Sequence, residues 1–122
     1  MEDLIIGCST NYDWSKIKYW INSVNQSGFK GKKVMILMNC DIETATKVLK
    51  AGFEVISFGT DAVGNLTHQS PFMVHVERFL HIYNYLKDNK FRYVITTDVK
   101  DVIFQKDPFI QLDNILSNTH KD

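Results

Sequence analysis

Two carboxylates follow an apolar run near the C-terminal end of the chain. The run is Tyr93–Thr97, YVITT, and Asp98 and Asp101 come directly after it, three residues apart. In open α/β sheets ligands bind outside the carboxyl ends of the strands, so acids in this place are candidates for a ligand site. Two such carboxylates can hold Mg²⁺ or Mn²⁺ together with the phosphates of a ligand. The plainer interpretation is that Asp98 caps a turn and Asp101 is a solvated surface charge, and the spacing fits both.

The rest of the chain alternates short apolar runs with helical patterns. Continuous apolar runs predict strands that are covered on both faces. Apolar repeats at helical spacing, flanked by capping residues and glycines, predict helices. The expected strands are 4–8, 33–39, 54–58 and 93–97, and the expected helices are 14–27, 42–51, 71–89 and 110–117. A polar connection over 59–69 is long for such a unit, and long loops are often functional.

The helical repeats also predict which side chains face the core. These are Trp14, Ile17, Ile21 and Val24 in the first helix; Ile42, Ala45 and Leu49 in the second; Phe72, Val76, Phe79, Leu80, Tyr83 and Leu86 in the third; Leu112, Ile115 and Leu116 in the last. The strand–helix alternation predicts one domain over 1–122, of α/β class. We expect a three-layer α/β/α sandwich around a mainly parallel, Rossmann-like sheet with strand order 3-2-1-4.

This strand order defines a crevice where the order reverses, between the first and fourth strands. The first strand ends in Cys8-Ser9-Thr10-Asn11, and Thr97 and Asp98 end the fourth. Hydroxyl and amide side chains are therefore expected to face the acids across one crevice, which favours a functional role for Asp98 and Asp101. Arg78 lies in the third helix, off its apolar stripe, and is either a phosphate or ribose contact or a solvated surface cation.

Composition and motifs exclude several classes of function. Fourteen basic and fourteen acidic residues cancel, so the chain shows no electrostatic footprint for nucleic acid. The chain contains neither a G-x-G-x-x-G after the first strand nor a G-x-x-x-x-G-K-[ST], which argues against dinucleotide-binding Rossmann domains and P-loop NTPases. No Asp follows the first strand directly, as the nucleophile of a haloacid-dehalogenase-like phosphatase would.

The two cysteines bear on the compartment. Cys8 and Cys40 match no zinc spacing and are expected to be buried free thiols in a reducing compartment, although a disulfide stays open. The N-terminus has no signal-peptide pattern, and no apolar run reaches membrane-spanning length. These features predict a cytoplasmic protein without a transmembrane segment.

Residues 93–109, YVITTDVKDVIFQKDPF, resemble the metal-binding segment of GT-A glycosyltransferases, in particular those with a T-D-x-[RK]-D-x-x-F-Q-x-[ND]-P-F pattern. The segment His75–Phe79, followed by Tyr83 and Leu86, is similar to the helix before it. The resemblance implies a GT-A fold and a transferase that uses a UDP- or GDP-sugar. Its donor nucleotide would contact Cys8, Ser9, Thr10, Asn11, Arg78, Thr97 and Asp98, and Asp98 and Asp101 would hold Mn²⁺ or Mg²⁺ on the diphosphate. Lys100 would add positive charge nearby or be simply exposed.

Two departures from the family pattern matter. The usual metal motif is Asp-x-Asp, so the spacing of Asp98 and Asp101 leaves open which of them binds the metal directly. A GT-A domain normally continues well past this segment with the acceptor site and any catalytic base. The resemblance therefore implies that 1–122 is a donor-binding half, incomplete at its C-terminus, with its catalytic residues unknown. Its acceptor (glycan, lipid or protein) is equally unknown. The alternative is a non-catalytic nucleotide- or metal-binding module, either a fragment or a pseudoenzyme.

Overall fold

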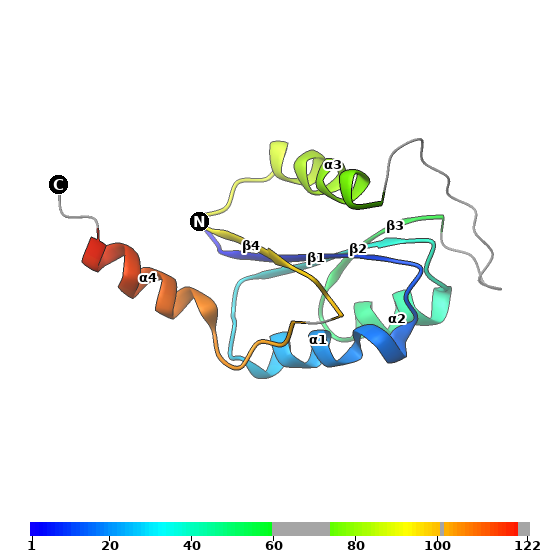
Figure 1. Ribbon diagram of the computed structural model, residues 1–122, viewed down its shortest axis with the longest axis horizontal. Helices are drawn as coiled ribbons and strands as arrows, with labels where there is room; N and C mark the ends of the chain where they lie inside the picture. The colour runs from blue at the N-terminus through cyan, green and yellow to red at the C-terminus, as the bar shows by residue number, and fades with distance from the viewer. Residues whose placement is uncertain (60–73, 101, 120–122) are drawn as a thin grey trace.

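The computed structural model describes residues 1–59, 74–100 and 102–119, without the side chains of 74–76, 111, 114 and 117–119. Its centre is a sheet of four parallel strands in the order β3-β2-β1-β4 (Figure 1). The strands are β1 (Leu4–Thr10), β2 (Lys32–Met38), β3 (Glu54–Phe58) and β4 (Val94–Thr97). The predicted α/β class and the predicted strand order are confirmed.

Helices cover both faces of this sheet. Helices α1 (Trp14–Gln26) and α2 (Ile42–Lys50) lie on one face and α3 (Val74–Lys87) on the other, while α4 (Pro108–Thr119) projects from one end (Figure 1). The end of α1 is set by Gly28 and that of α2 by Gly52, which take the left-handed conformations (φ of 85° and 95°) that glycine adopts without strain. Asp41 caps α2, because its side chain accepts the Thr44 N–H at 2.8 Å.

Two apolar layers hold the sandwich together. The central strands β1 and β2 contribute to both layers, which explains why their sequences are continuously apolar. Between the sheet and α1–α2 lie Ile5, Ile17, Trp20, Ile21, Val24, Met35, Leu37 and Val48. Between the sheet and α3 lie Leu4, Ile6, Cys8, Val34, Ile36, Met38 and Ile82. The predicted core face of α1 is confirmed at Ile17, Ile21 and Val24.

The predicted core faces of α2 and α3 are wrong at several positions. In α2, Ile42 and Leu49 are exposed and the buried residues are Thr44 and Val48. In α3, Phe79 and Tyr83 are 63% and 64% exposed and Leu80 is 42% exposed, while Ile82 packs on the sheet. The reason is that α3 packs on β1, β2 and β3 through Ile82, Tyr85 and Leu86, so its contact face is rotated away from the expected stripe.

β1 is longer than expected, and β4 is less buried than expected. β1 continues through Ser9 and Thr10, expected as a connection, because β2 is long enough to pair with them at Leu37 and Met38. The fourth strand, expected to be buried, lies at the edge of the sheet, and Val94 and Thr96 are exposed.

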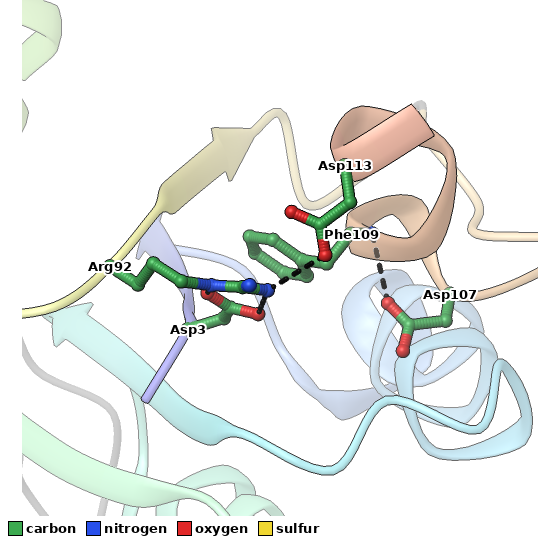
Figure 2. A network of polar contacts seen from close by, with 5 residues as sticks. All are labelled: Asp3, Arg92, Asp107, Phe109 and Asp113. Carbon is green, nitrogen blue, oxygen red and sulfur yellow. Dashed lines mark hydrogen bonds and ion pairs between the residues drawn. The ribbon is translucent and has the colours of Figure 1, made fainter. Parts of the chain in front are cut away.

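The C-terminal helix also differs from expectation. α4 begins at Pro108 rather than Ile110, because Asp107 accepts the Phe109 N–H at 2.9 Å and Pro108 suits the first helical position (Figure 2). Ile115 and Leu116, expected to face the core, are exposed. Arg92 fastens this helix to the N-terminus, since its guanidinium binds Asp3 through two hydrogen bonds of 2.9 and 2.7 Å and Asp113 at 3.1 Å (Figure 2).

Two expectations fall outside the described residues. The expected helix start at Ser70 and Pro71 cannot be compared with α3, which is described from Val74. The polar connection over 59–69 is described only at Gly59, which has a φ of 68°. None of the described helices is both long and apolar enough to span a membrane.

Candidate functional site

A cavity of about 150 Å³ lies at the carboxyl ends of β1 and β4. These two strands are the neighbours between which the strand order reverses, so the cavity occupies the place where open α/β sheets bind ligands. The cavity is lined by residues of β1 and the loop after it, of α3 and of the turn after β4: Cys8, Thr10, Tyr12, Arg78, Asp98 and Val99. Segments that are distant in sequence therefore meet at one site.

The end of β1 contributes alternate residues to this cavity. Successive side chains of a strand point to opposite faces, and Cys8 and Thr10 lie on the face that α3 covers. Ser9 does not line the cavity, and its buried hydroxyl has no hydrogen-bond partner among the described residues. Asn11 is exposed and turns the chain with a φ of 62°. Of the four residues predicted here, the structure thus brings two to the cavity.

Arg78 forms the wall that α3 contributes. Its side chain is half-buried, and its Nε atom is buried without a hydrogen-bond partner within the described part of the chain. A buried donor that stays unpaired costs about 1–3 kcal/mol, so a ligand oxygen that accepts this N–H would recover that cost. The planar guanidinium suits phosphate oxygens, which accept two parallel hydrogen bonds from it.

Asp98 caps the turn after β4 and lines the cavity at the same time. Its Oδ1 atom accepts the Lys100 N–H at 2.9 Å, which is the turn-capping role that the plainer interpretation expected. The carboxylate is exposed, so it stays open to a cation or a polar ligand. The Lys100 ammonium lies 5.7 Å from the ring centroid of Tyr12, a residue of the loop after β1.

A second cavity of about 190 Å³ adjoins the first. It lies between α3 and β4 and is lined by Arg78, Phe79, Ile82, Thr96, Thr97 and Asp98. Arg78 and Asp98 belong to both cavities, so they stand between the two spaces. Thr97, predicted as a nucleotide contact, lines this second cavity rather than the first.

The cysteines are buried free thiols, as predicted. Burial raises the pKa of the Cys8 thiol to about 12, although the nearby Arg78 charge works in the opposite direction. Burial likewise raises the pKa of Cys40. A thiol with a raised pKa is protonated at neutral pH and is a poor nucleophile, so Cys8 can contact a ligand in the cavity but is not suited to attack it.

The predicted metal ligands are described only in part. Asp101 lies outside the described residues, and Asp98 is the acidic side chain that the described residues place at the cavity. Within those residues no three His, Cys, Asp or Glu side chains form a metal-binding group. Mg²⁺ is commonly held by one or two carboxylates together with substrate phosphates, and Asp98 fits the protein part of that arrangement.

Two lining residues were not predicted as site residues. Tyr12 lies two residues after the end of β1, and its place beside Asn11, a predicted site residue, was the available signal. Val99 lies next to Asp98, but an aliphatic residue in a sequence carries no sign that it will line a polar cavity.

Comparison of the chain with family models, curated proteins and solved structures found no match in any of the three. The function must therefore be argued from the cavity and from the sequence around Asp98.

Proposed function

We propose that this chain is the donor-binding part of a GT-A glycosyltransferase, which binds a nucleotide-diphosphate sugar and transfers the sugar to an acceptor. The observation that carries the proposal is that Thr10, Arg78 and Asp98, from β1, α3 and the turn after β4, line one cavity at the switch point of a parallel sheet. The likeness of residues 93–109 to the metal-binding segment of that family supports it.

The charges at the cavity suit a diphosphate. Arg78 presents a buried, unpaired N–H and a positive charge, and an anionic oxygen satisfies both. Asp98 would hold Mn²⁺ or Mg²⁺ with Asp101, and the bound cation would stabilise the charge that develops on the departing nucleoside diphosphate. The ring of Tyr12 lines the same cavity and offers an apolar surface for a nucleobase.

The competing proposal is a nucleotide- or metal-binding module without turnover, and the chemistry of the described lining residues favours it. The Cys8 thiol at the cavity has a pKa raised to about 12 and is unsuited to covalent chemistry. Asp98, the acid that the described residues place at the cavity, is already the proposed cation ligand and so is not available as a catalytic base.

Calorimetry tests the shared claim of both proposals. We expect UDP or GDP to bind in the presence of Mn²⁺ and to bind much more weakly after addition of EDTA. Asp98→Asn and Asp101→Asn should remove the metal dependence, and Arg78→Met should weaken binding of UDP but not of uridine, which lacks phosphate. Asp88→Asn, a change of the same kind at an exposed residue at the end of α3, is the control. Equal binding by Asp88→Asn, Asp98→Asn and Asp101→Asn would refute a metal site on the acidic turn.

Turnover separates the enzyme from the binding module. Incubation of the chain with UDP- and GDP-sugars and Mn²⁺ releases UDP or GDP if the chain hydrolyses the donor or transfers its sugar. Release that disappears in Asp98→Asn supports a transferase. Binding without any release supports the module.

A further inference from the structure

We infer that helix α1 positions Asp98, by holding the chain on both sides of it through Trp20 and Ser23. The identity of the ligand that Asp98 binds rests on the proposed function. The contacts of Trp20 and Ser23 with the chain around Asp98 are independent of it. The segment from Thr97 to Phe104, which we call the acidic turn, contains Asp98 and Asp101. Among the described residues, this segment contacts α1 at both of its ends and β1 at Val99.

The first contact fixes the start of the acidic turn. The indole Nε1–H of Trp20 donates a hydrogen bond of 2.9 Å to the hydroxyl of Thr97, and the two residues are 77 positions apart in sequence. The Thr97 hydroxyl in turn donates to the backbone carbonyl of Asp98 at 3.3 Å. A buried indole is thus connected through one hydroxyl to the peptide unit that carries the carboxylate.

The second contact fixes the end of the acidic turn. The Phe104 N–H donates to the hydroxyl of Ser23 at 3.0 Å, and this hydroxyl donates to the carbonyl of Trp20 at 2.8 Å. The rings of Trp20 and Phe104 meet edge to face with centroids 6.0 Å apart. Trp20 and Ser23 lie three residues apart on one helix and therefore on one face, so a single face of α1 holds both ends of the acidic turn.

A third contact fixes the middle. Val99 is 2% exposed and packs over β1 at Gly7, where a side chain would not fit, because a Cβ there would lie 2.6 Å from Val99 Cγ1. The residue after Asp98 is therefore anchored in the core while Asp98 is exposed. With both neighbours of Asp98 fixed, its carboxylate is aimed before any ligand binds, which lowers the entropic cost of binding.

Trp20 is 1% exposed and does not line either cavity of the site, so its effect on a ligand must pass through Thr97 and Asp98. It is a positioning residue. Trp20→Phe keeps an aromatic ring but removes the Nε1–H together with part of the ring system, so its control must lose the same atoms elsewhere on the helix. Trp14→Phe is the matched control, since Trp14 lies on the same helix beside Lys47 and away from the acidic turn.

The experiment measures UDP affinity in the presence of Mn²⁺ for the wild type and for four variants: Trp20→Phe, Trp14→Phe, Asp98→Asn and the double variant Asp98→Asn/Trp20→Phe. Loss of one net hydrogen bond predicts that Trp20→Phe binds about fivefold more weakly, while Trp14→Phe binds as the wild type does. In an Asp98→Asn background, Trp20→Phe should add no further loss, because its effect passes through that carboxylate. A residue that merely stabilised the fold would not lose its effect in this background.

A second readout needs no ligand. Amide hydrogen exchange at Lys100, whose N–H is bonded to the Asp98 carboxylate, should be faster in Trp20→Phe than in Trp14→Phe. Unchanged exchange at Lys100 would overturn the inference, as would equal UDP affinity in Trp20→Phe and wild type. If the wild type binds no nucleotide, the proposed function fails, and Lys100 exchange alone decides on the positioning role. Ser23→Ala replaces Trp20→Phe in both measurements if the latter does not fold.

Discussion

Replacement of Gly7 by alanine tests how tightly the acidic turn is packed on β1. The added Cβ would lie 2.6 Å from Val99 Cγ1, 2.9 Å from the Trp20 ring and 3.1 Å from Met35 Cε. Carbon atoms in contact are normally about 3.5–4.0 Å apart, so the first overlap approaches 1 Å. β1 is paired on both sides and cannot move away, so the free energy of unfolding should fall by about 1–3 kcal/mol.

Urea unfolding of five variants identifies the cause of this loss: Gly7→Ala, Val99→Ala, Gly28→Ala and the double variants Gly7→Ala/Val99→Ala and Gly28→Ala/Val99→Ala. Val99→Ala removes the nearest clashing atom, so it should cost less in the Gly7→Ala background than in the wild type, with a coupling of about 1 kcal/mol. Gly28→Ala is the control, because a Cβ at this position would meet nothing within 4 Å. The residue has a φ of +85°, so alanine here would strain the backbone without a clash. That backbone strain costs about 1–2 kcal/mol and should not respond to Val99→Ala. Additive losses for Gly7→Ala and Val99→Ala would refute the proposed clash.

Three further predictions concern titration and capping. The Arg92 hydrogen bonds hold the pKa of Asp3 below its usual 3.8, so their stabilisation is complete above about pH 5 and is lost as the pH falls through the lowered pKa. Thermal melts should therefore show the wild type losing its advantage over Arg92→Met as the pH falls below 3.8. Cys8 and Cys40, with pKa values raised by burial, should react with iodoacetamide at pH 8 only after urea unfolding. Asp41→Ala should lower the free energy of unfolding by about 1 kcal/mol in urea titrations.

The sequence predicts strand order well because its central strands carry a strong signal. Continuous apolar runs such as 4–8 and 33–39 occur where both faces of a strand are covered, and the alternation with helices leaves few arrangements for a parallel sheet. The buried side of a helix is harder to predict from sequence, because it depends on where the helix lies over the sheet. Phe79 and Tyr83 continue an apolar repeat, yet α3 packs through Ile82.

The site was predictable where it follows from strand order and hidden where it depends on three-dimensional contacts. Placing β1 beside β4 predicts that Thr10 and Asp98 approach each other, and both line the cavity. The bond between Trp20 and Thr97 spans 77 positions and has no local signature. Trp20 is buried although it was not among the residues expected on the core face of the first helix, and nothing in the sequence indicates the partner of its indole N–H. Which residues hold Asp98 could therefore be found only from the structure.

The two interpretations of Asp98, as a turn cap and as a ligand-binding acid, do not exclude each other. A carboxylate has about four lone-pair sites, and the Lys100 N–H occupies one of them on Oδ1. The cap fixes the orientation of the carboxylate relative to its own backbone, and Trp20, Ser23 and Gly7 fix that backbone relative to the sheet. Because a cation requires oxygens held at defined distances, an acid that is first a cap is better prepared to be a ligand than one on a free side chain. The structural role of Asp98 thus argues for its proposed binding role.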